Sequence, residues 1–270
     1  MTKAPTVRLA LGGTGRHRAF HEFPTRLEYF NTPATQNSPN TPVREPPSVL
    51  ISFVYLQGFL KKRRDYHITD WALDSGAFSA HNSGTEIRLD EYIETCKHLM
   101  KTDDQLTDIF SLDVIGDWRA SQENTDVMWN AGVPAIPCYH IGEPEKVLID
   151  LAKRHPKIAL GGVAKLKGKK KLEWTSQCFA RVYPKKIHGF GYATRDAVMG
   201  LPFHSTDATS WELRPAKFGS WPSYDGLNLR IRGSKHDLRT EVNFFLELQR
   251  DARSRWKTEM TKLENLDNEQ

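Results

Sequence analysis

The sequence predicts a (β/α)8 barrel formed by a single domain of 270 residues. Three observations support this fold class. Eight short apolar segments have the character of strands, helical stretches alternate with them, and neither a helix-only nor a hairpin pattern repeats. A doubly wound open sheet is the main competitor, because a sequence alone does not reveal whether a sheet closes on itself.

The elements follow from local patterns along the chain. The segment 49–55 is nearly all apolar, as expected of a strand buried on both faces, whereas 89–101 has apolar residues at helical spacing. Pro, Asn, Thr and Ser dominate 31–48, which predicts a loop-rich excursion. The predicted strands are 6–11, 49–55, 68–73, 108–114, 133–139, 157–160, 186–190 and 202–205. The predicted helices are 89–101, 121–130, 144–154, 174–182, 195–199 and a closing helix at about 236–260.

Composition limits the class of protein. Hydrophobic residues make up 39% of the chain, enough for a sizeable core. No apolar run approaches the ~18 residues of a membrane span, and the polar N-terminus lacks a signal-peptide core, so we expect a cytoplasmic protein without a membrane partner. The formal net charge is +5, which suits a polyanionic partner but is also common among ordinary enzymes.

Two common kinds of site are not expected. The run Gly12-Gly13-Thr14-Gly15 lacks the Lys-Ser/Thr pair that closes a phosphate-binding loop. Cys96, Cys138 and Cys178 lie far apart, which argues against a disulfide framework and against a CxxC zinc site. The sequence therefore predicts neither a metal nor a cofactor.

Chemically useful residues recur where the predicted strands end. In a barrel all carboxyl ends of the strands lie on one face, so these residues would converge there. A carboxylate at the end of a buried strand costs desolvation energy unless a function requires it, although Asp74 alone could equally be a turn residue before Ser75 and Gly76. The converging residues would be Asp74, Asp113, His140, Gly161, Gly162 and Asp207.

Such a set favours acid–base or covalent chemistry. Two carboxylates that face one bond can break the bond between C1 of a sugar and a heteroatom, one by attack and the other by proton transfer. Glycines after the sixth strand would let the backbone approach a flat ligand and offer its N–H groups to a carbonyl. A small-molecule glycosidase or N-ribosyl hydrolase fits this set as well.

Several motifs resemble those of the tRNA-guanine transglycosylase superfamily, over roughly 49–211 and in the same order. Leu73-Asp74-Ser75-Gly76-Ala77-Phe78 is similar to an Asp-Ser-Gly-Gly-Phe motif, and Gly161-Gly162-Val163-Ala164 to a Gly-Gly-Leu-Ala motif. His188-Gly189-Phe190-Gly191 resembles a Met-Gly-Val-Gly strand. The segment 203–211 resembles the nucleophile region of the DNA-acting branch, the 7-deazaguanine DNA transglycosylases of phages and bacterial modification clusters.

The resemblance implies a role for each matching residue. Asp207 would be the nucleophile at C1′, and Asp74 the general acid/base. Phe78 would stack on the base, Asp113 would accept hydrogen bonds from it, and the backbone of Gly162 would donate to its carbonyl. His140 falls near a base-recognition Gln of the family. The residues assigned to base binding are Asp113, Phe78, Ser75, Gly76, His140, Gly161 and Gly162.

The resemblance also implies the partners, which would be guanine-containing DNA and a 7-deazaguanine base such as preQ0. The cysteine-rich zinc module of the tRNA enzymes is missing from the sequence, so no zinc subdomain is expected, although tRNA stays an alternative substrate. A basic run directly after the Gly-Gly strand could hold the phosphates beside a flipped nucleotide, or it could be a solubilising loop. Its lysines are Lys165, Lys167, Lys169, Lys170 and Lys171. The oligomeric state is left open.

Overall fold

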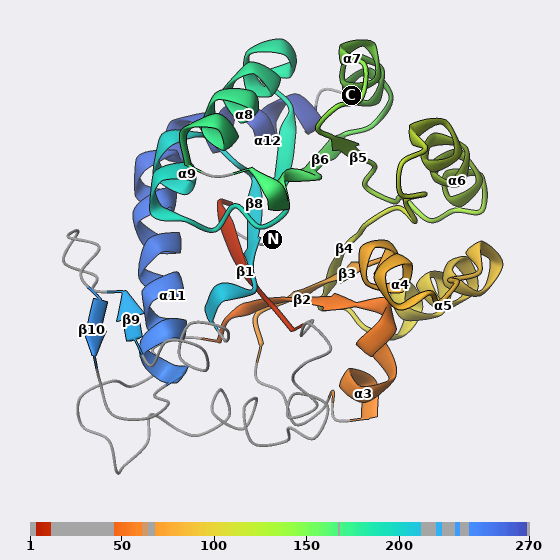
Figure 1. Ribbon diagram of the computed structural model, residues 1–270, viewed down its shortest axis with the longest axis horizontal. Helices are drawn as coiled ribbons and strands as arrows, with labels where there is room; N and C mark the ends of the chain where they lie inside the picture. The colour runs from red at the N-terminus through yellow and green to blue at the C-terminus, as the bar shows by residue number, and fades with distance from the viewer. Residues whose placement is uncertain are drawn as a thin grey trace.

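The strands form one parallel sheet of eight, in the order β4-β3-β2-β1-β8-β7-β6-β5 (Figure 1). The computed structural model describes residues 4–11, 46–61, 63, 68–166, 168–211, 220–222, 230–232 and 238–268. The strands of the sheet are β1 (Thr6–Ala10), β2 (Ser48–Ser52), β3 (Trp71–Asp74), β4 (Leu106–Ile109), β5 (Cys138–His140), β6 (Lys157–Gly161), β7 (Lys186–Gly189) and β8 (Ser205–Ala208).

The sheet closes between its two outer strands, β4 and β5. The closure consists of a parallel bridge between Phe110 and Ile136, just beyond β4 and just before β5. The Ser111 N–H donates to the Ile136 carbonyl at 2.9 Å, and the Ile136 N–H donates to the Ile109 carbonyl at 2.8 Å. Closure excludes the open doubly wound sheet and confirms the predicted (β/α)8 barrel.

Helices surround the strands (Figure 1). They are α3 (Leu56–Lys61), α4 (Ala77–Ser83), α5 (Leu89–Thr102), α6 (Trp118–Asn130), α7 (Glu145–Arg154), α8 (Gly168–Val182), α9 (Arg195–Gly200), α11 (Leu238–Arg255) and α12 (Lys257–Asn268). Helix α11 packs against β1 and α9. Its Gln249 side chain accepts a hydrogen bond from the Val7 N–H at 2.8 Å, which ties the end of the chain to the first strand.

Alternate residues of each strand point into the barrel. One interior layer is apolar and forms a cluster separate from the larger core between strands and helices; its buried members are Ala10, Leu50, Ala72, Phe110, Ile136, Cys138 and Ala159. On β3 the inward residue of this layer is Ala72, with Asp70 two residues before it and Asp74 two residues after it. The two-residue period therefore places one acid at the amino end of the barrel and another at the carboxyl end.

Several boundaries differ from the prediction. Strand β8 begins three residues later than predicted, so Asp207 lies inside a strand, and β4 ends at Ile109, so Asp113 lies in the following loop. Phe110 and Leu112 are buried without belonging to the ladder, which made the strand look longer in the sequence. Helix α8 begins at Gly168, six residues before the predicted start.

The remaining differences lie toward the two ends of the chain. The predicted closing helix is two helices, α11 and α12. A short antiparallel pair, β9 (Ser220–Pro222) with β10 (Arg230–Arg232), was not predicted. Most of the predicted excursion, 31–45, lies outside the described residues, and Ser48 already belongs to β2. Within the described part of the chain, no helix has the length and apolar character needed to span a membrane.

Candidate active site

Asp74 is the last residue of β3, and the turn that follows it orients its carboxylate. The backbone N–H groups of Ser75 and Gly76 are near enough to this carboxylate to lower its pKa. Gly76 has a φ of +77°, and a Cβ at this position would lie 2.7 Å from Oγ of Ser52, the last residue of the neighbouring strand β2. A side chain is therefore excluded at Gly76 both by conformation and by space, and the Ser-Gly pair serves to position the acid.

The pKa of Asp74 is raised to about 7. Burial is the largest cause, followed by the negative charges of Asp207 and Asp113, while the N–H groups of Gly76 and Ser75 act in the opposite direction. The three acids predicted from strand ends are thus close enough to interact. A carboxyl that titrates near neutral pH can both donate and accept a proton there.

Asp207 is buried in β8, and the loop after β7 holds it. The Gly191 N–H donates to its Oδ1 at 2.7 Å, and the Ala193 N–H donates to its backbone carbonyl at 3.1 Å. His188 Nε2 lies 3.6 Å from the same Oδ1. The described contacts therefore fall on one carboxylate oxygen, and this arrangement suits a nucleophile that attacks with the other.

Asp113 and His140 form a pair across the seam between β4 and β5. His140 Nε2 lies 3.3 Å from Asp113 Oδ2, and His140 Nδ1 lies 3.1 Å from Glu143 Oε1. The pKa of His140 is raised, first by Cys138 and then by its contacts with Asp113 and Glu143. Burial raises the pKa of Asp113, although the hydrogen bond from His140 opposes this shift.

Gly161 and Gly162 end β6 beside this pair. A Cβ on Gly161 would lie 2.7 Å from Cys138 Sγ and 3.3 Å from His140 Nε2. Gly162 has a φ of +74° and is exposed. The predicted Gly-Gly segment therefore lies against His140 and leaves its own backbone open to a ligand.

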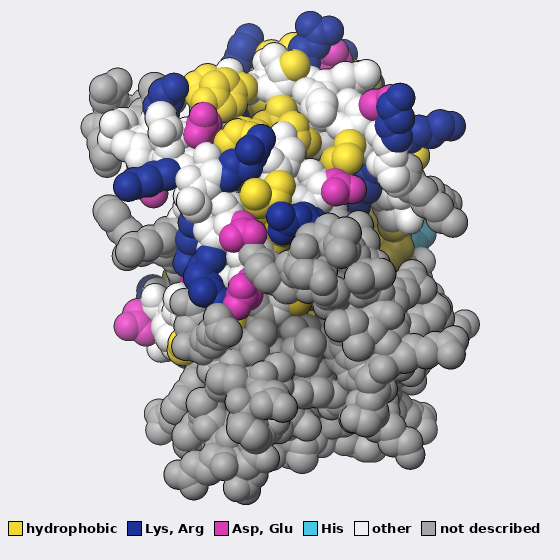
Figure 2. Space-filling view, turned by 90° about the vertical axis from the view of Figure 1, so that its left-hand side faces the viewer, with side chains coloured by type: hydrophobic (Ala, Val, Ile, Leu, Met, Phe, Trp, Pro, Cys, Tyr) yellow, Lys and Arg dark blue, Asp and Glu magenta, His cyan; other side chains and the backbone are white. Residues whose placement is uncertain are grey.

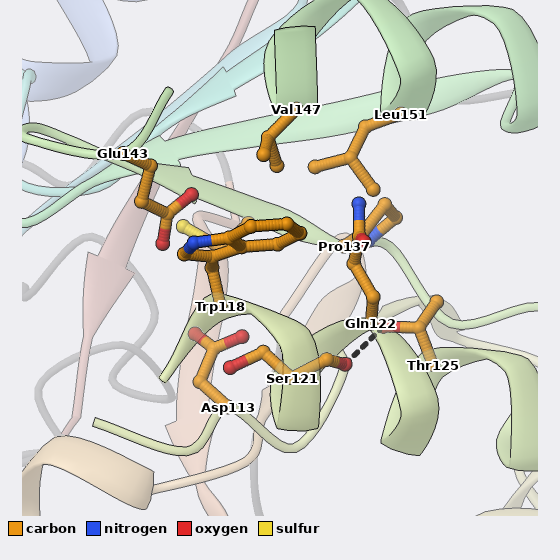
Figure 3. Close-up of a pocket in the computed structure, with 10 residues that line it drawn as sticks. Asp113, Trp118, Ser121, Gln122, Thr125, Pro137, Glu143, Val147 and Leu151 are labelled. Carbon is orange, nitrogen blue, oxygen red and sulfur yellow. Dashed lines mark hydrogen bonds between the residues drawn. The ribbon is translucent and has the colours of Figure 1, made fainter. Parts of the chain in front are cut away.

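Two aromatic residues, Phe78 and Trp118, lie beside the group of three acids. Phe78, on α4, is 64% exposed although it is a large apolar side chain. Trp118, on α6, lines a cavity of about 10 Å³, roughly the space of one water molecule, together with Asp113, Cys138 and Glu143. Figure 3 shows the carboxylates of Asp113 and Glu143 on either side of the Trp118 side chain. Neither Asp74 nor Asp207 lines this cavity, so it adjoins the candidate site rather than containing it.

The predicted basic run has two kinds of lysine. Lys169 and Lys170 are exposed in the first turn of α8, and the Lys169 side chain is 90% exposed. Lys171 is half-buried; its Nζ donates to the Gly191 carbonyl at 2.8 Å and lies 4.0 Å from the centre of the Tyr192 ring. Lys165 is the last residue of a short 3-10 helix, Val163–Lys165, and Lys167 lies outside the described residues. Lys171 therefore supports the loop that holds Asp207.

Basic side chains elsewhere do not gather into one patch on the face shown in Figure 2. Lys and Arg side chains on its described part are spread among acidic and apolar ones. Any recognition of a polyanion would therefore depend on particular side chains near the barrel mouth more than on the net charge.

Asp113, Cys138 and His140 could also bind a metal ion, since they bring an oxygen, a sulfur and a nitrogen within 4.8 Å of one another. Burial raises the pKa of the Cys138 thiol to about 11, which disfavours the thiolate that a metal needs. Asp113 and His140 already compensate each other's charge. The geometry favours an ion pair that recognises a polar ligand.

Sequence reasoning did not predict the contacts around the acids, although it named Lys171 for phosphate binding and quoted His188 and Gly191 in a motif. His188, Gly191, Glu143 and Lys171 each contact a predicted site residue or the loop around it. A signal for His188 was available, because it alternates with Phe190 on a strand and must point into the barrel. No local pattern indicates that Lys171 reaches Gly191 from a different βα unit.

Known proteins similar to this chain were found only among solved structures. No protein-family model matches the sequence, and no curated protein sequence matches it. Among solved structures, a mutant tryptophan synthase α-subunit from the hyperthermophile Pyrococcus furiosus has a TM-score of 0.48 and 10% sequence identity. That match covers 90% of this chain and 97% of the α-subunit. The candidate site therefore rests on its own geometry.

Proposed function

We propose that the protein is a transglycosylase that exchanges guanine in DNA for a 7-deazaguanine base, through a covalent bond between Asp207 and deoxyribose. The observation that carries the proposal is the meeting of three acids at the mouth of the barrel. Asp74 and Asp113 have raised pKa values, and Asp207 is held through one oxygen only among its described contacts. Buried acids that lie close together are costly to ionise, and base exchange needs acids in this place.

The reaction balances without a cofactor or an energy source. Asp207 Oδ2 attacks C1′, the bond between C1′ and the guanine nitrogen breaks, and Asp74 donates a proton to the departing base. The incoming base then gives its ring proton to Asp74, its nitrogen attacks C1′, and the ester bond to Asp207 breaks. One glycosidic bond replaces another, and Asp74 regains its proton.

Other residues bind the bases and the strand in this proposal. Asp113, oriented by His140, accepts hydrogen bonds from the base, while the exposed backbone of Gly162 faces its carbonyl. Phe78 offers an exposed ring for stacking. Lys169 and Lys170, at the start of α8, contact the phosphates of the flipped nucleotide.

Incorporation of labelled guanine tests the proposal directly. The protein is incubated with labelled guanine and either duplex DNA, single-stranded DNA or tRNA, and unlabelled preQ0 is then added to displace the label. Label in DNA supports the proposal, whereas label in tRNA alone would assign the same chemistry to RNA. Free base released without incorporation would indicate a hydrolase.

A matched set of variants identifies the nucleophile. Denaturing gels should show a DNA–protein adduct with the wild type and none with Asp207→Asn. Asp117→Asn is the control, because Asp117 is an exposed cap of α6 and Asn caps helices equally well. An adduct that persists in Asp207→Asn and disappears in Asp113→Asn would move the covalent step to Asp113.

A further inference from the structure

His188 lies beneath Asp207 in the interior of the barrel, fully buried, and the resemblance-based assignment gives it no role. It is an inward-pointing residue of β7. Phe110 and Phe190 contact its ring, with ring centres 4.6 Å and 4.7 Å away. These contacts fix the plane of the imidazole.

The two ring nitrogens of His188 have different surroundings. Nδ1 forms a hydrogen bond with Ser205 Oγ at 2.9 Å, two residues before Asp207 on β8. Nε2 is buried without a hydrogen-bond partner and lies 3.6 Å from Asp207 Oδ1. A buried nitrogen without a partner is costly, so this one calls for a functional explanation.

The tautomer follows from the charge that Nε2 faces. If Nδ1 carried the proton, the lone pair of Nε2 would point at a carboxylate oxygen, which is repulsive. If Ser205 donates to Nδ1, the proton is on Nε2 and points toward Asp207. At 3.6 Å this contact is too long for a hydrogen bond, but such contacts commonly shorten when substrate binds.

We propose that His188 is a positioning residue for the nucleophile, whose Nε2–H, oriented by Ser205, directs Asp207 Oδ1 so that Oδ2 faces C1′. This inference rests on the proposed function of Asp207. With the Gly191 N–H it gives Oδ1 two donors, which also stabilise the carboxylate when the ester bond breaks.

Kinetics of exchange provide the first test. His188→Met fills the site without a donor, and we expect kcat to fall by roughly 10- to 100-fold with KM for DNA unchanged. His188→Gln keeps an N–H near the position of Nε2 and should recover part of the loss. Equal kcat values for the Met and Gln variants, both folded, would overturn the proposal.

Ser205→Ala keeps the test valid if the His188 variants do not fold. It should lower kcat by a smaller factor, and it should have no further effect when added to His188→Met, because the two residues act through one contact. A fully additive effect of Ser205→Ala in the double variant would contradict a shared role.

A magnetic-resonance titration separates this inference from the proposed function, since it needs no substrate. Burial lowers the pKa of His188, Asp207 raises it, and Lys157 and Arg8 lower it further. In Asp207→Asn the pKa of His188 should therefore fall below its wild-type value, and the nitrogen chemical shifts should identify the Nε2–H tautomer. An Nδ1–H tautomer or an unchanged pKa would refute the inference even if exchange occurs. Absence of exchange together with the expected titration would instead refute the proposed function and leave the contact between His188 and Asp207 established.

Discussion

The two ends of the barrel treat buried acids in opposite ways. At the amino end, Arg8 of β1 contacts both Asp70 and Asp108, and Lys157 Nζ lies 2.8 Å from Asp108 Oδ2. At the carboxyl end, neither Asp74 nor Asp207 has a lysine or arginine ion pair among the described residues. Asp70, just before β3, and Asp74, at its end, lie four residues apart, so the difference between them arises from their neighbours.

The pKa values record this difference. Burial alone would raise the pKa of Asp108, but Lys157 and Arg8 lower it. Burial, together with the negative charges of Asp207 and Asp113, raises the pKa of Asp74 to about 7. An acid compensated by cations contributes to structure, whereas an acid left among other acids is available for chemistry.

The largest expected effect is on chemistry at the carboxyl end. Asp207→Asn should lower the rate of exchange on the order of 10⁴-fold, because the amide cannot form the covalent intermediate. Rates from labelled-guanine incorporation give the effect, and urea denaturation should show a free energy of unfolding close to that of the wild type. A folded variant that keeps more than a tenth of the activity would remove Asp207 from the mechanism.

The next largest effect is on stability at the amino end. Asp108→Asn leaves Arg8 and Lys157 buried with less compensation and should lower the free energy of unfolding by about 3–5 kcal/mol. Asp90→Asn is the control: its pair with Arg88 is 66–71% exposed, so its loss should leave the free energy of unfolding nearly unchanged. Equal effects of the two substitutions would abolish the contrast between the ends.

The pH dependence of stability should carry opposite signs at the two ends. The pKa of Asp74 is raised to about 7 on folding, so the folded state holds an extra proton between about pH 4 and pH 7, and stability from this residue is lost as the pH rises through that range. Asp108, with a lowered pKa, gains stability above its ordinary pKa and loses it only in acid. Between pH 5 and pH 8, the free energy of unfolding of the wild type should therefore fall by about 2–3 kcal/mol more than that of Asp74→Asn. If the free energy of unfolding changed equally in both proteins between these pH values, the pKa of Asp74 would not be raised by folding.

The smallest effect distinguishes the two kinds of lysine near the mouth. Lys169→Met should raise KM for DNA about threefold and reduce the salt dependence of binding by about one counterion, without changing kcat. Lys171→Met should instead lower kcat with little change in the salt dependence, because its Nζ is bound to Gly191. Lys153→Met, at an exposed position of α7, is the control for a general charge effect. If the Lys169 and Lys171 variants changed kcat, KM and the salt dependence in the same way, the two lysines would have the same role.

The ends of three strands could be predicted from the sequence because each has a local signature. The apolar run that ends in Asp74, the strand that ends in His140 and the glycines at 161–162 lie where they were predicted. Asp113 and Asp207 were also predicted as site residues, but the predicted strands around them differ from β4 and β8. The reason is that buried residues continue past the end of β4 and begin before β8.

The compensated cluster at the amino end could not be predicted. Arg8, Asp108 and Lys157 come from β1, β4 and β6, and only closure of the barrel brings them together. The start of α8 was missed for another reason. The run of glycine and lysines before Trp174 was placed outside the predicted helix, although lysine is a good helix former and the following residues continue the helix.

The seam of the barrel runs directly below the ion pair of Asp113 and His140. Neighbouring strand pairs elsewhere share two to four register positions, whereas β4 and β5 meet only through Phe110 and Ile136 among the described residues. The amides of Ser111 and Ile136 should therefore exchange with solvent sooner than those of β1 and β2. Each opening would separate Asp113 from His140 and widen the candidate site between β4 and β5, while the opposite wall of the barrel, which carries Asp207, stays intact.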